Sequence, residues 1–280
     1  MPRSPMTPMM LHKETTINGQ RIAYHESRGK GPPVLFIHGN SMSGYCFARQ
    51  FASPLGEQYH LVALDLPGHG GSSPAHDPKS AYTLPAYAAT VAAFASKLTI
   101  NNAVLVGWSL GGHVLLETMG HLQESAGLMI LGAPPVGKPM SAKAFIPNPL
   151  IPLLFQPDLN DEEITALAAA FFKPEREIPT FFHDDMRRTD GAAREVLGSS
   201  IGEGNYTDEI AVAANLDKPL AVMHGERDSL INLSHIKSLA MPSLWRNAIQ
   251  IIPEAGHAAH WAQPKAFNRL LNEFITDCSR

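Results

Sequence analysis

The sequence has 280 residues, a formal net charge of -4 and 44% hydrophobic residues. This length fits one large α/β domain or a domain with an insertion, and the apolar content is enough for a sizeable core. The 22 Lys and Arg residues are spread along the chain. No basic patch indicates a nucleic-acid partner, and no polybasic amphipathic stretch indicates a membrane surface.

The cysteines and the first residues bear on the cellular compartment. Cys46 and Cys278 lie far apart in sequence, which is not a disulfide framework and suits a reducing compartment. No Cys/His cluster has the spacing of a structural zinc site. Residues 1–16 contain Pro and polar residues where a secretory signal needs an unbroken apolar core, and no apolar run approaches the roughly 18 residues of a spanning helix. We therefore expect a cytoplasmic protein without a metal site.

Short apolar runs and helical patterns alternate along the chain. Asn18-Gly19 between two short segments is a type I′ hairpin signal. The periodic segments Leu84–Leu98 and Leu110–Leu122 predict helices. Runs suited to buried parallel strands are Val34–Ile37, Leu61–Leu64, Ala103–Val106, Leu128–Leu131, Leu220–Met223 and Ala248–Ile252. This alternation predicts an α/β fold with a mostly parallel, twisted sheet flanked by helices.

One region interrupts the alternation. Residues 136–215 contain no convincing strand, whereas Asp161–Phe172 reads as a helix capped by Asn160, with Glu163 at its third position. We interpret residues 136–215 as a mainly helical cap. It would be inserted into a core formed by residues 1–135 and 216–280.

The segment Gly107–Gly112, with the sequence GWSLGG, joins a predicted strand to a predicted helix. A G-x-S-x-G nucleophile elbow requires that context. The glycines permit a tight, strained turn that lifts the serine hydroxyl above the sheet, and the helix N-terminus supplies N–H groups for a developing oxyanion. The alternative is an incidental glycine-rich turn. We interpret Ser109 as a catalytic nucleophile.

A serine nucleophile needs a positioned base. Among 13 histidines we favour His257, because it follows the last predicted strand and the histidine comes last in the chain order of such sites. His260 and His235 are its nearest rivals, and we expect supporting or surface positions for them.

The acid that orients this histidine should follow the preceding strand. Asp228 lies three residues after Gly225, far enough beyond the strand end to turn back towards His257, and Glu226 is the alternative. The carboxylate would hold the imidazole tautomer and stabilise its cationic form without taking the proton.

The oxyanion hole is expected at the end of the first parallel strand. Gly39 permits a tight turn there, so that the backbone N–H groups of Asn40 and Leu110 can converge on one oxygen. Gly39 and Trp108 are the candidate substrate-binding residues, with a packed core position as the alternative for Trp108.

Several other residues receive structural interpretations. His38 ends a strand and should have a structural role, and His113 should pack behind the elbow helix. The cap phenylalanines could roof an apolar pocket, but we favour a small core of the cap itself; they are Phe171, Phe172, Phe181 and Phe182.

These residues, in this order, resemble the α/β-hydrolase superfamily over nearly the whole chain. The matching segments are His38-Gly39, Asp65–Gly70, the Ser109 elbow, Gly225–Asp228 and Gly256-His257. A closer resemblance is to the metal-independent N-acylhomoserine lactonases of this fold. It is carried by Ile37–Ser41, Gly107–His113, Gly132–Val136 and Arg188–Gly191.

The closer resemblance implies hydrolysis of the lactone ring of bacterial signalling molecules by a Ser, acid and His triad. It implies a small ester or lactone substrate with an apolar acyl group, and neither a metal nor an organic cofactor. The acid in those lactonases can be Glu, so Asp228 is a departure. Gln263-Pro264 also stands where many superfamily members have Glu-Pro.

Two other classes of function remain open from the sequence. One is a general carboxylesterase or another serine-dependent member of the fold, such as a C–C bond hydrolase or a perhydrolase. The other is a small-ligand receptor on a hydrolase scaffold. A haloalkane dehalogenase or an epoxide hydrolase is disfavoured because it would carry Asp at position 109. The sequence leaves the oligomeric state open.

Overall fold

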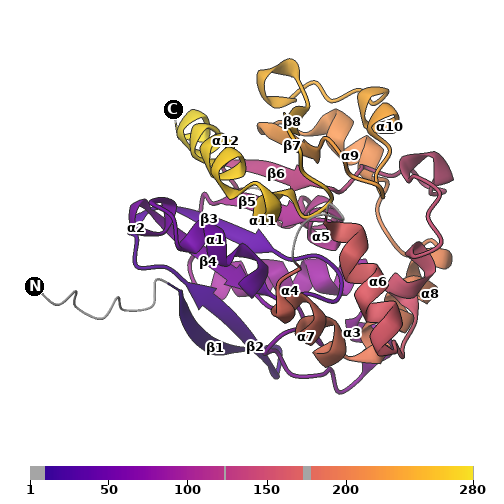
Figure 1. The fold of residues 1–280 in the computed structure, drawn as a ribbon. Coiled ribbons are helices and arrows are strands. Elements are labelled where there is room, and N and C mark those ends of the chain that lie inside the picture. Colours follow the sequence, from indigo (N-terminus) through magenta and orange to yellow (C-terminus); the bar gives the residue numbers. More distant parts are fainter. Residues whose placement is uncertain (1–9, 123, 173–177, 280) are drawn as a thin grey trace, which may run out of the picture.

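An eight-stranded sheet runs through the molecule (Figure 1). The computed structural model describes residues 10–122, 124–172 and 178–279. The strand order is β1-β2-β4-β3-β5-β6-β7-β8, with β1 and β2 antiparallel to their neighbours and β3 to β8 parallel. The strands are β1 (Leu11–Ile17), β2 (Gln20–Glu26), β3 (Gly31–Ile37), β4 (Tyr59–Leu64), β5 (Val104–Trp108), β6 (Gly127–Leu131), β7 (Leu220–Gly225) and β8 (Gln250–Ile252). The predicted mostly parallel sheet is confirmed.

The predicted strands and hairpin are confirmed, although β5 begins one residue later than predicted, at Val104, and β8 begins two residues later. Asn18 and Gly19 have φ values of 48° and 81° and join β1 to β2, as a type I′ turn requires. β8 begins at Gln250, two residues later than predicted. Arg246 and Asn247, with φ values of 58° and 50°, form a left-handed turn just before it. Extended pairing can therefore begin only after that turn.

Helices flank the sheet (Figure 1). Those outside the cap are α1 (Ala48–Phe51), α2 (Leu55–Gln58), α3 (Pro78–Ala81), α4 (Leu84–Lys97), α5 (Leu110–Thr118), α10 (Leu233–Lys237), α11 (Ala259–Ala262) and α12 (Pro264–Cys278). α12 buries one apolar stripe at helical spacing, formed by Phe267, Leu270, Leu271, Phe274 and Ile275. α5 ends at Thr118 and not at Leu122, because the N–H groups of His121 and Leu122 both turn back to the Thr118 carbonyl.

Between β6 and β7 the described residues form helices and contribute no strand to the sheet. The longer ones are α6 (Asp161–Phe171), α7 (Thr180–Arg188), α8 (Gly191–Gly202) and α9 (Glu209–Asn215), preceded by the 3₁₀ turns η2 (Ala142–Ala144) and η3 (Ile151–Phe155). The capping box that begins α6 is present as predicted: the Asn160 side chain accepts the Glu163 N–H, and the Glu163 carboxylate accepts the Asn160 N–H. Figure 1 shows α6, α7 and α8 together, away from α12. The division at residues 136 and 215 remains an interpretation.

Gly111 marks the closest approach of α5 to the sheet. A Cβ atom at this position would lie 2.1 Å from the carbonyl oxygen of Ile37, whereas one at Gly120 would have no atom within 4 Å. We predict that Gly111→Ala lowers the free energy of unfolding by about 2–3 kcal/mol, because the backbone must move to admit the methyl group. The matched control Gly120→Ala should change it by less than about 0.5 kcal/mol. Denaturant unfolding measures both, and equal stabilities would contradict the packing argument.

Candidate active site

Ser109 lies at a sharp turn between β5 and α5. Its φ of 53° and ψ of -121° are strained for a residue with a side chain. The Ser109 N–H donates to the Leu131 carbonyl at 2.8 Å, which ties the turn to β6. A Cβ atom at Gly107 would lie 2.5 Å from the backbone of Gly111, so the turn closes only with glycine there. The predicted strand–turn–helix geometry is present.

His257 and Asp228 follow β8 and β7, two neighbouring strands. His257 Nδ1 lies 2.8 Å from Asp228 Oδ2, and both side chains are at most 2% exposed. Asp228 Oδ1 also accepts the N–H groups of Leu230, at 2.9 Å, and Ile231, at 3.2 Å. These donors fix the direction in which the carboxylate points.

Electrostatics favour an ionised Asp228. Burial alone would raise the pKa of this carboxyl, but the His257 charge, its hydrogen bond and the Leu230 N–H together hold the pKa below its ordinary value. An ionised acceptor requires the His257 proton on Nδ1. The other ring nitrogen, Nε2, is then available to accept a proton.

The alternative acid and the rival histidines occupy other positions. Glu226 is exposed, and its carboxylate accepts the N–H of Glu254. Asp228 is therefore the acid that contacts His257. His260 is fully buried against Trp108, and burial lowers its pKa to about 3. His235 donates from Nε2 to the Pro135 carbonyl at 3.0 Å.

Ser109 and His257 line one cavity of about 540 Å³. Its walls are mainly apolar and come from both sides of the site, including Leu84, Phe145, Ile146, Ile151, Leu154, Phe155, Leu197, Ile201, Leu230 and Ile231. The polar lining residues are Asn40, Ser109, His113, Asn148, Glu209 and His257. A largely apolar chamber with few polar groups is typical of a site for a small, mostly apolar ligand.

The backbone around Asn40 and Leu110 suits an oxyanion hole. Within the described chain neither N–H donates to an acceptor, and both residues line the cavity with Ser109. Leu110 begins α5, where an N–H has no partner within the helix. His38 supports the loop: Nε2 accepts the Leu66 N–H at 2.9 Å, and Nδ1 donates to the Gly39 carbonyl at 2.8 Å. The structural role predicted for His38 is thus consistent with its contacts.

Gly39 and Trp108 are not among the residues that line the cavity. A Cβ atom at Gly39 would lie 3.1 Å from the Trp108 ring and 3.3 Å from Ser109 Cβ. Trp108 is 1% exposed, and its Nε1 donates to the His257 carbonyl at 3.0 Å. The structure therefore gives Trp108 the core position that the sequence left as the alternative. Its contact supports the loop that carries His257.

The four phenylalanines pack in a core, but it is not confined to residues 136–215 as expected, because their rings also contact Tyr45, Trp108, His257 and Trp261. Phe171 packs edge-on against Trp108 with ring centroids 5.6 Å apart, and Phe182 packs against Phe172 at 4.8 Å. None of the four is among the cavity-lining residues. Phe145 and Phe155, which the sequence did not single out, line the cavity in their place.

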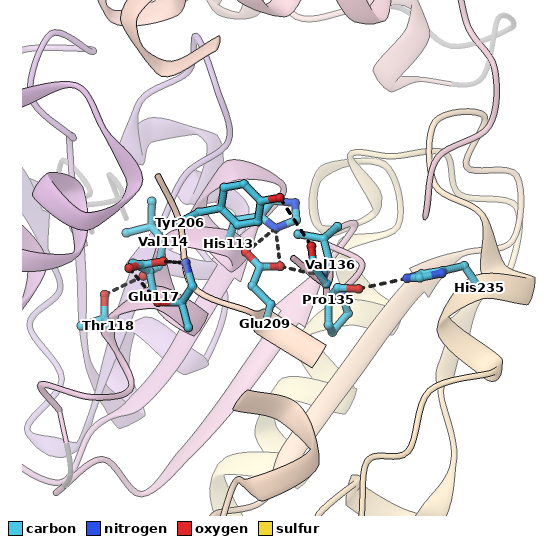
Figure 2. A network of polar contacts seen from close by, with 11 residues as sticks. His113, Val114, Glu117, Thr118, Pro135, Val136, Tyr206, Glu209 and His235 are labelled. Atoms are coloured by element: carbon cyan, nitrogen blue, oxygen red, sulfur yellow. Dashed lines mark hydrogen bonds and ion pairs between the residues drawn. The ribbon is translucent and has the colours of Figure 1, made fainter. Parts of the chain in front are cut away.

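The expectation for His113 was wrong. It does not pack behind the elbow helix but lines the cavity beside Ser109. Its Nδ1 lies 2.9 Å from both carboxylate oxygens of Glu209, a residue of the cap helix α9 (Figure 2). Glu209 lies 96 residues further along the chain, so no local sequence pattern could pair the two.

The described ranges contain no group of three or more His, Cys, Asp or Glu side chains placed to hold a metal ion. In the same part of the chain, no helix has both the length and the apolar character needed to cross a membrane. Cys46 and Cys278 are both free thiols.

Comparison with known proteins defines the class. A model of the alpha/beta hydrolase family matches residues 34–270, and the chain belongs to that family. The structure of N-acyl homoserine lactonase AidH complexed with N-butanoyl homoserine is similar, with a TM-score of 0.92 and 34% identity over 96% of this chain and 98% of that one. The predicted α/β-hydrolase fold is confirmed.

Sequence relatives are more distant and include esterases. A pimeloyl-(acyl-carrier protein) methyl ester esterase of Xanthomonas oryzae pv. oryzae is 29% identical over 247 residues, or 85% of each chain. Non-heme chloroperoxidase CPO-A1 of Kitasatospora aureofaciens is 26% identical over 286 residues, or 93% of this chain and 98% of its own. With its family and these relatives, the chain is a hydrolase that acts on carboxylic ester bonds.

The contact between Asp228 and His257 generates a prediction about the acid. Asp228→Asn should lower kcat for a p-nitrophenyl ester by about 10⁴-fold, because an amide at this position can stabilise the wrong imidazole tautomer. Glu226→Gln is the matched control, with an exposed side chain in the same loop, and should change kcat by less than about twofold. Initial rates and melting temperatures of both variants test this. A larger loss in Glu226→Gln would assign the acid to Glu226.

Proposed function

We propose that this hydrolase uses Ser109, His257 and Asp228 to open the lactone ring of N-acylhomoserine lactones. The observation that carries the proposal is the shared cavity, in which a strained serine and a carboxylate-paired histidine meet an apolar chamber. The reaction needs a nucleophile, a base and a place for an acyl group. The described residues supply candidates for all three.

The proposed mechanism gives each of these groups one role. Ser109 Oγ attacks the lactone carbonyl while His257 Nε2 takes its proton, and the N–H groups of Asn40 and Leu110 stabilise the oxyanion. His257 then returns the proton to the ring oxygen, which leaves as a tethered alcohol. Water activated by His257 releases Ser109 and the opened acid. Asp228 holds the imidazole orientation and stabilises its cationic form throughout.

Similarity to a lactonase supports the choice of substrate. The AidH structures share 33–34% identity with this chain over nearly its whole length, and their ligands include N-hexanoyl homoserine and N-hexanoyl homoserine lactone. Cleavage of such signals would make the protein a quorum-quenching enzyme. The proposal includes a cytoplasmic location, which two free thiols suit.

A general carboxylesterase is the second candidate. The same triad cleaves esters and lactones, since a lactone is an ester whose leaving alcohol stays attached. The similarity to pimeloyl-(acyl-carrier protein) methyl ester esterases favours this candidate. The two functions differ in relative rates on matched substrates.

Hydrolysis of N-hexanoyl homoserine lactone and of p-nitrophenyl hexanoate separates these candidates. We predict faster ring opening than ester cleavage, unchanged by EDTA, and a loss of at least about 10³-fold in kcat for Ser109→Ala. Ser199→Ala is the matched control, because Ser199 is exposed on the cap helix α8; it should retain full activity.

Each other outcome selects a different function. Ester cleavage without ring opening would contradict the lactonase and leave a serine esterase. Stoichiometric binding of the lactone without Ser109-dependent turnover of either substrate would favour a receptor.

A further inference from the structure

His113 is a polar group in the cavity that the triad and the oxyanion hole do not use. It lies one helical turn after Ser109 on α5, and its N–H approaches the Ser109 carbonyl at 3.4 Å. Four residues of α-helix rise about 6 Å, and helical side chains lean towards the N-terminus. The His113 ring therefore leans back towards the nucleophile, along the wall of the chamber that both residues line.

Glu209 holds this ring in place. The Glu209 side chain is 0% exposed. Its carboxylate accepts a hydrogen bond from His113 Nδ1 at 2.9 Å and another from the Val136 N–H at 3.0 Å (Figure 2). The Glu209 and Ile210 N–H groups in turn donate to the Val136 carbonyl. One turn after His113 on α5, Glu117 accepts the N–H and the hydroxyl of Thr207, just before the start of α9. A rigid support of this kind fixes the orientation of the imidazole.

The second ring nitrogen of His113 remains available to a ligand. In the described structure Nε2 has no hydrogen-bonding partner, yet it is not among the fully buried unsatisfied atoms. The His113 side chain is 16% exposed and lines the cavity, so its open edge faces that space. Burial acts against the charged ring, but the Glu209 charge and hydrogen bond prevail and raise the pKa of His113. A doubly protonated ring donates from both nitrogens.

Other polar lining groups are already engaged in hydrogen bonds. Asn40 Nδ2 donates to the Leu154 carbonyl at 2.7 Å, and Glu209 is an acceptor already engaged by two donors. The Asn148 side-chain oxygen accepts the Leu150 N–H, and this residue belongs to the segment between β6 and β7 and not to the elbow helix. In a mostly apolar chamber, a fixed donor of this kind sets the orientation and the identity of the ligand.

We propose that His113, held by Glu209, donates from Nε2 to a carbonyl oxygen in the substrate arm, and so selects substrates with an amide beside the scissile ester. In such a substrate four bonds separate the scissile carbonyl carbon from the amide oxygen, and a planar trans amide limits this span to about 4 Å. A hydrogen bond adds about 3 Å, so the amide oxygen can bridge to a donor that lies about one helical turn from the nucleophile. N-acylhomoserine lactones have this arrangement, and simple fatty esters and alkyl lactones do not. The inference rests on the proposed site but not on lactone cleavage.

Two matched substrate pairs isolate the amide. The lactone pair is N-hexanoyl homoserine lactone and α-heptyl-γ-butyrolactone. The ester pair is the methyl ester of N-hexanoylglycine and methyl nonanoate. Within each pair the chain length is equal and only the amide differs. The readout is the amide preference, defined as the ratio of kcat/KM for the amide substrate to that for its alkyl partner.

The variants remove the donor without leaving a buried charge. Replacing His113 alone would strand the Glu209 carboxylate, which is strongly destabilising. The double variant His113→Leu with Glu209→Gln has no charge at this position, and the glutamine oxygen still accepts the Val136 N–H. Glu209→Gln alone is the comparison variant: its oxygen still accepts the Val136 N–H and its amide N–H can donate to His113 Nδ1, so a neutral ring carries its proton on Nε2 and the donor is kept. Melting temperatures confirm that each variant is folded.

We expect the wild type to prefer the amide substrate in every pair that it cleaves. The amide preference should fall about tenfold in the double variant, because one hydrogen bond to the substrate is lost. It should fall by less than about threefold in Glu209→Gln. An unchanged preference in the folded double variant would overturn the inference. The absence of an amide preference in the wild type would also overturn the inference, and that result does not depend on any variant folding. Amide preference on esters without lactone cleavage would support the inference and contradict only the lactonase.

Discussion

A carboxylate and an imidazole meet 2.8 Å apart in a space from which water is almost excluded, and the geometry of the site follows from that contact. An ionised Asp228 would be costly there without donors, so the N–H groups of Leu230 and Ile231 converge on its other oxygen. Gly132 leaves room for the ring, since a Cβ atom there would lie 2.8 Å from His257. The parallel order of β6, β7 and β8 brings these three loops together at one edge of the sheet.

Close packing around the elbow holds Ser109 in its strained backbone conformation. The turn is held by glycines that approach neighbouring backbone and by the hydrogen bond from Ser109 to Leu131. The cap closes the other side of the chamber and is fastened to the core by polar contacts. The Asn40 side-chain amide donates to the carbonyl of Leu154 in the cap, and the His113 ring donates to the Glu209 carboxylate. Asn40 and His113, which line the cavity, thus also tie residues between β6 and β7 to the sheet and its elbow.

The sheet and the positions of Ser109 and His257 could be predicted from sequence because short-range patterns and the strand order of the fold determine them. The sequence favoured Asp228 as the acid but left Glu226 as the alternative, since both lie in one loop and only its turn decides which side chain points inward. The surroundings of Trp108 and His113 were harder to predict from the sequence. Both flank the nucleophile in sequence, yet one packs in the core and the other faces the cavity. Their partners, His257 and Glu209, lie 149 and 96 residues away, beyond any local periodicity.

Activation of Ser109 by the His257–Asp228 pair is the central claim, and covalent labelling tests it most directly. The protein would be treated with a p-nitrophenyl dialkyl phosphate, and the rate and site of phosphorylation followed by mass spectrometry. We predict one adduct per chain, on Ser109, formed at least about 10²-fold more slowly in His257→Gln because the serine then lacks its base. Rapid labelling of Ser109 in His257→Gln, or an adduct on another residue of the wild type, would contradict the account.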